Sequence, residues 1–327
     1  MTILVTGVAG FIGMHVSEVL LASGERVVGV DNLNDYYDVG LKEDRLARLE
    51  RHENFTFHKI DMADHAAFMT AMAGQDDVTG VVHLAAQAGV RHSLTHPFDY
   101  ADANVTGFLT ILEYCRHLKT RPHLVYASSS SVYGANNELP YSVDQAADRP
   151  VSLYAATKKA NELMAYTYAH LYGLPSTGLR FFTVYGPWGR PDMAYWLFTD
   201  KILKGEPVQI YNQGDMMRDF TYIDDVVTGI LSVLAHPPQK TDAEPPHKVY
   251  NLGNNQAEKL LDFVAIIEKA LGLKAERELL PMQPGDVKAT FADIDPIRQD
   301  VGYEPTTTLE EGLPKFVKWY QEYISKD

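Results

Sequence analysis

The chain has 327 residues, of which 46% are hydrophobic and 22% charged, and this balance predicts about two globular domains and excludes a disordered or fibrous protein. A formal net charge of -14 at pH 7 makes a nucleic-acid backbone or an anionic membrane surface an unexpected partner. Cys115 is the only cysteine, and no apolar run has membrane-spanning length or the form of a leader, so we expect a cytoplasmic protein.

The first half of the chain alternates short apolar runs with helical patterns. The runs resemble buried parallel strands in length and character, and they lie at residues 2–6, 26–31, 55–61, 80–85, 123–128 and 177–182. Between the first two, residues 11–23 place Ile12, Val16 and Leu20 on one helical face, and Gly24 ends the pattern. This alternation predicts an α/β fold of the Rossmann type, with a doubly wound parallel sheet whose ligand lies at the carboxyl ends of its strands.

The pattern becomes less regular after about residue 182, where turns rich in proline and glycine precede short strands and helices. We therefore predict a first, Rossmann-type domain over residues 1–180 and a second, smaller α/β domain over residues 181–327. A segment near residues 220–250 could instead pack back on the first domain.

Three glycines separate the first predicted strand from the first helix: Gly7, Gly10 and Gly13. They suit a tight turn, a close approach of the backbone to a pyrophosphate and close packing of the helix on the sheet. The next strand ends at Asp31, whose carboxylate can bind both hydroxyls of an adenosine ribose and would repel a 2′-phosphate. Together these features favour NAD over an ordinary glycine-rich turn, while Lys42 and Arg45 downstream keep NADP as an alternative.

Two other predicted strands end beside the same expected site. Asp61 would face an adenine amino group or, equally, cap the following helix. The fourth strand ends in small residues that allow close approach of a cofactor, whereas His83 is expected to pack within the strand. No group of histidine, cysteine and acidic residues has the spacing of a metal site.

Tyr154 and Lys158 lie four residues apart in a helical stretch from about residue 152 to 172, so their side chains share a helix face. A phenol titrates near pH ~10 and is a poor base unless a neighbouring cation lowers its pKa. Ser129, in the hydroxyl cluster after the fifth strand, could complete the hydrogen bonds around a reacting oxygen. We predict a catalytic group of Tyr154, Lys158 and Ser129; the competing interpretation is a solvated helix face.

These residues together resemble the extended short-chain dehydrogenase/reductase family over nearly the whole chain. Residues 129–134, 179–187 and 218–225 are also similar to its nucleotide-sugar branch. The resemblance implies bound NAD and epimerisation of a UDP-sugar at C4 through a transient 4-keto sugar. The cofactor-binding residues expected on the combined grounds are Gly7, Gly10, Phe11, Ile12, Gly13, Asp31, Asn32, Asp61, Met62, Leu84, Ala85, Ala86, Tyr154 and Lys158.

Within that branch, dehydratases and uronate decarboxylases carry an acid after the catalytic hydroxyl residue, where this chain has Ser130 and Ser131. Residues 189–194 are similar to those of UDP-glucuronate 4-epimerases. The resemblance thus implies conversion of UDP-glucuronate to UDP-galacturonate. The alternatives are a UDP-glucose or UDP-N-acetylglucosamine 4-epimerase and, from another class, a non-catalytic NAD-binding regulator, which would be expected to lose Tyr154 or Lys158.

The resemblance also implies substrate contacts and a homodimer. Thr183 and Arg190 would face the uronate carboxylate, which suits the planar fork of an arginine. The remaining implied contacts are Arg218 at the pyrophosphate, Gln209 and Tyr211 at the uracil, Asp286 at the uridine ribose and Arg91 at an anion. Helices at residues 104–117 and 152–172 would form a four-helix interface with a second copy.

Overall fold

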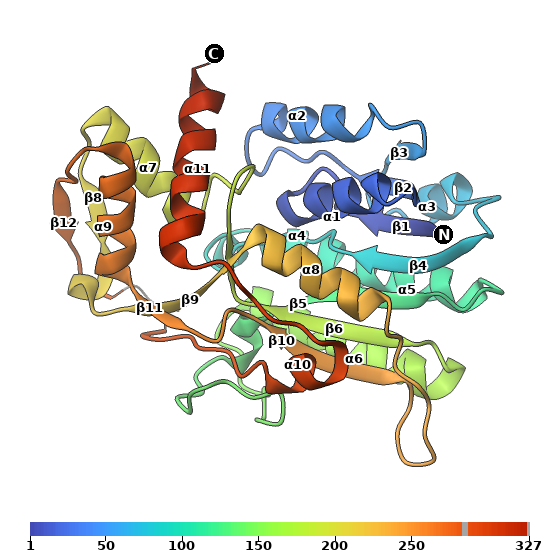
Figure 1. Cartoon of the computed structure of the whole chain (residues 1–327). Coiled ribbons are helices and arrows are strands. Elements are labelled where there is room, and N and C mark those ends of the chain that lie inside the picture. The colour runs from blue at the N-terminus through green and yellow to red at the C-terminus, as the bar shows by residue number, and fades with distance from the viewer. Residues whose placement is uncertain (283–286, 326–327) are drawn as a thin grey trace.

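The structure, a computed structural model, describes residues 1–282 and 287–325 and is built around a seven-stranded parallel sheet (Figure 1). The strand order is β10-β6-β5-β4-β1-β2-β3. The strands are β1 (Thr2–Thr6), β2 (Arg26–Asp31), β3 (Phe55–Lys59), β4 (Val78–His83), β5 (His123–Ser129), β6 (Ser176–Phe181) and β10 (His247–Leu252). The predicted Rossmann-type sheet is therefore confirmed, with strand bounds that differ from the expected ones by a few residues.

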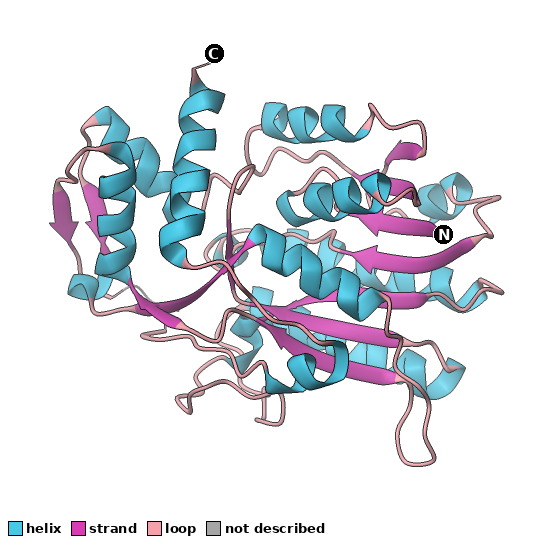
Figure 2. Cartoon of the chain, in the orientation of Figure 1, coloured by secondary structure: helices cyan, strands magenta, loops and turns pink. Residues whose placement is uncertain are grey.

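Helices cover both faces of this sheet (Figure 2). On one face α1 (Phe11–Ala22) packs between α2 (Val39–Leu49) and α8 (Ile223–Leu234). On the other, α5 (Gly107–His117) packs between α3 (His65–Ala71) and α6 (Leu153–Tyr172). A short helix, α4 (Pro97–Tyr100), and a π-helical turn, Ala101–Thr106, lead into α5.

A smaller unit lies beside the large sheet and contains two short sheets (Figure 1). One sheet has the order β11-β9-β7 and the other joins β12 to β8. Its strands are β7 (Thr183–Tyr185), β8 (Val208–Ile210), β9 (Met217–Tyr222), β11 (Ala257–Lys259) and β12 (Arg277–Leu279). Its helices are α7 (Ala194–Lys204), α9 (Leu260–Leu271) and α11 (Leu309–Ile324), of which α9 packs against both others.

The chain crosses between the two units more than once. Helix α8 packs on α1, β10 pairs with β6, and α10 (Asp295–Val301) packs on β10, although all three follow residue 180. The segment near residues 220–250 thus lies with the large sheet, and the division at residue 180 stays a prediction.

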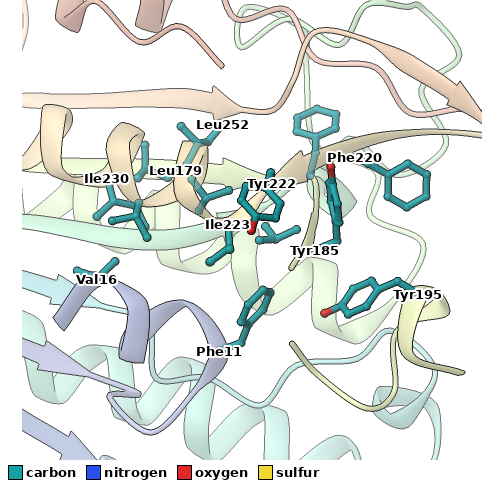
Figure 3. Packing of buried hydrophobic residues seen from close by; sticks show 14 of the residues in the cluster. Phe11, Val16, Leu179, Tyr185, Tyr195, Phe220, Tyr222, Ile223, Ile230 and Leu252 are labelled. Carbon is teal, nitrogen blue, oxygen red and sulfur yellow. The ribbon is translucent and has the colours of Figure 1, made fainter. Parts of the chain in front are cut away.

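One continuous hydrophobic core joins the two units. Figure 3 shows it running from Val16 and Ile230, beside the large sheet, to Tyr185 and Phe220 in the smaller unit. Phe220 stacks on the ring of Phe263 with centroids 4.5 Å apart. This shared core holds the carboxyl ends of the large sheet against the smaller unit. No helix in the described part of the chain is both long and apolar enough to cross a membrane.

Candidate active site

The turn from β1 to α1 packs so closely that its glycines leave no space for side chains. Gly7 has a φ of +70°, and a Cβ added there would lie 2.7 Å from the backbone nitrogen of Ala85. A Cβ on Gly13 would lie 2.1 Å from the carbonyl oxygen of Gly7. Gly10, the residue before α1, provides no side-chain cap, and the first turn of the helix contains no acidic residue. Its first N–H groups are therefore suited to bind a phosphate.

Asp31 lies at the carboxyl end of β2, next to this turn. Its carboxylate accepts hydrogen bonds from the backbone nitrogens of Ala9 (3.1 Å) and Leu33 (2.9 Å). Burial raises the pKa of the Asp31 carboxyl, although these two hydrogen bonds and the Lys42 ammonium act in the opposite direction. A carboxylate held in this way at the strand end fits the hydroxyls of a ribose.

The two cations that could have met a 2′-phosphate already have hydrogen-bond partners within the protein. The Lys42 ammonium donates to the carbonyl and side-chain oxygens of Asn34, at 2.6 and 2.5 Å. The Arg45 guanidinium, fully buried, donates to the carbonyl oxygens of Trp188 (2.7 Å) and Gly189 (2.8 Å). Both side chains stabilise loops, which favours NAD over NADP.

These elements surround a cavity of about 260 Å³ at the carboxyl ends of β1, β2, β4 and β5. Every cofactor-binding residue expected from the sequence lines it, from Gly7 to Ala86 and on to Tyr154 and Lys158. The catalytic candidate Ser129 and the substrate candidate Arg190 line it too. The glycine turn, the uncapped start of α1 and the Asp31 carboxylate, which suits a ribose, together fit a dinucleotide.

Tyr154 and Lys158 lie together as the helical spacing predicted, and Ser129 lines the same cavity. Ser152 caps α6 by accepting from the backbone nitrogen of Ala155, so Tyr154 lies in the first turn and Lys158 one turn later. The Ser129 hydroxyl, at the end of β5, forms a hydrogen bond with the Tyr154 phenol. The Lys158 ammonium donates to the carbonyl oxygen of Ala127 at 3.0 Å.

A cation that was not expected there also acts on the Tyr154 phenol. Burial raises the pKa of Tyr154, while the Ser129 hydrogen bond and the Arg190 guanidinium lower it. Burial also lowers the pKa of Lys158 to about 8, because the ammonium is almost fully enclosed. The role of Lys158 beside the phenol stays a prediction, and the structure adds a second cation, Arg190, which comes from the smaller unit.

A buried ion pair supports the end of β5 from behind and was missed in the sequence. Glu162, one turn after Lys158, accepts from Arg180 Nε (2.8 Å) and Nη2 (2.9 Å) and from the Ser128 hydroxyl (2.7 Å). Burial raises the pKa of Glu162, but Arg180 and its hydrogen bonds outweigh burial and hold the pKa well below its usual range. One feature of the sequence could have indicated this ion pair: Arg180 is a charged residue within a predicted buried strand, β6, and a buried charge needs a partner.

Arg190 lies on the loop between β7 and α7 and is paired with an acid that was not predicted. Its Nε and Nη2 donate to the two carboxylate oxygens of Asp192, at 3.0 and 2.5 Å. The Tyr36 hydroxyl donates to the same carboxylate at 3.1 Å. The Tyr195 ring also lines the cavity, and its hydroxyl oxygen accepts from the Arg190 backbone nitrogen.

The other substrate candidates lie outside the first cavity. Thr183 and Arg218 line a second cavity of about 170 Å³ together with Ser130 and Ser131. Because Ser129 lines the first cavity and Ser130 the second, the two cavities lie next to each other. Arg218 Nη1 donates to the carbonyl oxygens of Met217 and Lys288, at 2.8 and 3.2 Å.

Three further candidates form a group that lines neither cavity. The Tyr211 hydroxyl donates to Gln209 at 3.3 Å, and the Arg91 guanidinium lies 5.4 Å from the centre of the Tyr211 ring. Asp286 lies outside the described residues. Among residues 1–282 and 287–325, no cluster of three or more histidine, cysteine or acidic side chains could hold a metal ion.

Comparison with known proteins identifies relatives along the whole chain. It is 48% identical to UDP-glucuronate 4-epimerase 4 of Arabidopsis thaliana, over 100% of this chain and 76% of that protein. It is 46% identical to a probable UDP-glucuronate 4-epimerase of Rhizobium meliloti, over 98% of this chain and 97% of that protein. The structure of UDP-glucuronic acid 4-epimerase from Bacillus cereus with UDP-glucuronic acid and NAD matches with a TM-score of 0.89 at 34% identity, covering 99% of this chain and 100% of that one.

A model of the NAD dependent epimerase/dehydratase family matches residues 3–253, which contain the glycine turn, Asp31 and the Tyr154–Lys158 pair. The resemblance stated from the motifs is thereby confirmed. The chain belongs to the NAD dependent epimerase/dehydratase family.

Proposed function

We propose that this protein interconverts UDP-glucuronate and UDP-galacturonate by NAD-dependent epimerisation at C4 of the sugar. The observation that carries the proposal is the position of Arg190, whose guanidinium lines the same cavity as Tyr154 and Lys158. A neutral hexose offers this guanidinium no charged partner, whereas a uronate offers a carboxylate that matches its planar fork. The names of the Arabidopsis, Rhizobium and Bacillus cereus proteins support the same substrate.

The residues of the first cavity divide between cofactor and substrate. The glycine turn and the first turn of α1 would hold the pyrophosphate of NAD, and Asp31 would bind its adenosine ribose. When bound, NAD supplies a hydride acceptor and donor for the sugar carbon. The nucleotide of the substrate extends toward the second cavity, where Arg218 provides positive charge.

Tyr154 moves the proton in this scheme. Its phenolate accepts the proton of the C4 hydroxyl as that carbon is oxidised and returns it when the carbon is reduced from the other face. Ser129 donates to the reacting oxygen or to the phenolate. Arg190 adds positive charge near the phenol, which partly offsets the cost of its burial. Lys158 donates to the Ala127 carbonyl and lines the cavity that would hold the cofactor.

A uronate places a special demand on such a site. Oxidation at C4 creates a ketone β to the C5 carboxylate, and such acids lose carbon dioxide when the C5–C6 bond breaks and its electron pair enters the ketone as an enolate. The loss requires that bond to align with the ketone π system. Arg190 and Thr183 would hold the carboxylate away from this alignment and keep its charge in place. Their role is thus to suppress decarboxylation as well as to bind.

We propose a homodimer in the cytoplasm. Helices α5 and α6 expose large apolar side chains that suit a four-helix interface: Leu109 (42%), Leu163 (60%), Tyr166 (44%) and Leu171 (62%). The single cysteine, Cys115, is buried and unpaired, which suits a reducing compartment.

The function is tested by incubating purified protein separately with UDP-glucuronate, UDP-glucose and UDP-N-acetylglucosamine and assigning the products by proton NMR. The proposal predicts UDP-galacturonate from the first, with turnover of the other two lower by at least about tenfold, because only the uronate meets Arg190 with charge. If UDP-glucose is turned over as fast as UDP-glucuronate or faster, the proposal of a uronate substrate is wrong and a neutral hexose is the substrate.

A further inference from the structure

Asp192 contacts only one edge of the Arg190 guanidinium. Nε and Nη2 donate to the two oxygens of Asp192, and the Tyr36 hydroxyl also lies within reach of the guanidinium; among the described residues, Nη1 has no partner at hydrogen-bonding geometry. A guanidinium has five N–H donors in a rigid plane, so the edge formed by Nη1 and Nη2 still offers a pair of parallel donors. Arg190 lines the first cavity, and Asp192 lies behind it, outside the residues that line that cavity.

The pair is more than a surface ion pair. The exposed fractions of the Arg190 and Asp192 side chains are 25% and 31%, and both are anchored by neighbours. Burial raises the pKa of Asp192, but the Arg190 guanidinium and the Tyr36 hydroxyl outweigh it and hold the pKa below its usual range. Asp192 is therefore charged at neutral pH and forms charge-assisted hydrogen bonds with one fixed edge.

Tyr36 fixes Asp192 from the opposite unit of the molecule. It lies on the loop between β2 and α2, and its ring packs on His92 with centroids 4.9 Å apart. A Cβ on Gly89 would lie 2.4 Å from the Tyr36 hydroxyl, so the ring is closely confined. From the same part of the chain, Arg45 binds the carbonyl oxygens of residues 188 and 189, just before Arg190.

We propose that Asp192, held by Tyr36, is a positioning residue that fixes the Arg190 guanidinium so that its Nη1–Nη2 edge faces the substrate carboxylate. The inference rests on the proposed function, because it assigns the free edge to a uronate. Asp192 does not touch the substrate itself. It balances the charge of Arg190 and prevents rotation of the guanidinium plane, so one carboxylate of the protein and one of the substrate share a single arginine.

This arrangement has a specific consequence for the reaction. A guanidinium free to rotate could still attract a uronate, but it could not hold the carboxylate at a fixed angle to the ring while the 4-keto sugar is present. Loss of Asp192 should therefore affect turnover and product identity more than binding, since misplacement of about 1 Å can cost roughly 100-fold in rate. Decarboxylation should increase because the alignment of the C5–C6 bond is no longer restricted.

The test compares wild type with Asp192→Asn and Tyr36→Phe, using the purified protein with its bound cofactor. Asparagine offers one acceptor oxygen and an NH₂ group that faces the guanidinium donors, so one of the two hydrogen bonds from Arg190 to residue 192 is lost. For Asp192→Asn we expect kcat on UDP-glucuronate to fall about 10-fold, KM to stay within about 3-fold, and the ratio of UDP-pentose, or its 4-keto form, to epimer to rise at least about 3-fold. Tyr36→Phe should shift the same quantities in the same direction by less.

Two matched variants serve as controls. Asp77→Asn disrupts another Asp–Arg pair, with Arg26, near the amino ends of β2 and β4, and Tyr250→Phe removes another Tyr–Asp hydrogen bond, to Asp300. Both should retain the wild-type kcat and product ratio. Asp192→Glu, which keeps the charge, should recover part of the epimer yield.

The outcomes separate the inference from the proposed function. A wild-type protein that does not epimerise UDP-glucuronate overturns both. If wild type is active, an Asp192→Asn variant with the wild-type kcat and product ratio overturns the positioning role. A variant whose kcat falls and whose KM rises while the product ratio stays at the wild-type value also overturns it, because that pattern indicates a general disturbance of the site.

Discussion

Removal of the buried carboxylate of Glu162 should weaken the fold and the catalytic strand together. In Glu162→Gln, the amide offers one acceptor oxygen where the carboxylate binds Arg180 through two, and the Arg180 charge stays buried without a counter-charge. Both side chains are only 4% exposed, so water cannot replace the lost partner. Breaking such a pair costs about 3–5 kcal/mol of the free energy of unfolding.

This cost can be expressed as a melting temperature. With an unfolding entropy of about 2 cal/mol/K per residue over 327 residues, about 3–5 kcal/mol corresponds to a fall in Tm of roughly 4–7 °C. Scanning calorimetry of wild type and variant at pH 7 measures it. Because the pKa of Glu162 is lower in the folded state, its contribution is present above its usual pKa of 4.5 and is lost as pH falls below that value. The difference in Tm should therefore be constant from pH 7 to pH 6.

Two further variants test whether the fall in Tm comes from the unpaired buried charge. Glu322→Gln disrupts an exposed pair with Lys318 and should change Tm by less than about 1 °C. The double variant Glu162→Met with Arg180→Met leaves no buried charge and should recover most of the loss. The reasoning is refuted if Glu162→Gln melts within about 1 °C of wild type, or if the double variant is no more stable than the single one.

Three other predictions address the site and the assembly. Tyr154→Phe should retain the fold, measured by circular dichroism, and lose at least about 100-fold in kcat, since the phenol moves the proton; near wild-type turnover would exclude it. Burial lowers the folded pKa of Lys158 from 10.5 to about 8, so between pH 7 and pH 11 the unfolded state binds more protons at this residue. The unfolding free energy of cofactor-free wild type, measured relative to Lys158→Met in urea titrations, should therefore rise by about 3 kcal/mol over this range, and a difference that does not change with pH would contradict the lowered pKa. Light scattering at micromolar concentration should give a dimer that Leu163→Glu dissociates, and a 36.6 kDa wild-type particle would contradict the dimer.

The sheet and the cofactor cavity could be predicted because their signals are local in the sequence. Buried parallel strands are continuous apolar runs, and the glycine turn follows directly from the first of them. Tyr154 and Lys158 share a face because a helix brings residues four apart together. Asp31 comes at a strand end, where parallel topology places every ligand-binding loop at one edge.

The rest could not be predicted because it depends on contacts between distant parts of the chain. Tyr36 and Asp192 are 156 residues apart, and neither lies in a pattern that indicates the other. The effect of charge on Tyr154 followed the same rule. Helical spacing indicated Lys158, whereas the loop after β7 also brings Arg190 toward the phenol, and no local pattern indicated that. Packing of β10 at the edge of the large sheet likewise depends on a return of the chain from the smaller unit.

The central claim is that the hydrogen at C4 leaves the sugar and returns to the same carbon on the other face. The direct measurement uses UDP-glucuronate that carries deuterium at C4, incubated with the purified protein in ordinary water without added nucleotide. Proton NMR and mass spectrometry of the product then locate the label. The account predicts UDP-galacturonate that retains deuterium at C4, because hydride returns from a cofactor that never leaves the protein. Product that carries hydrogen from the solvent at C4, or no UDP-galacturonate at all, would contradict it.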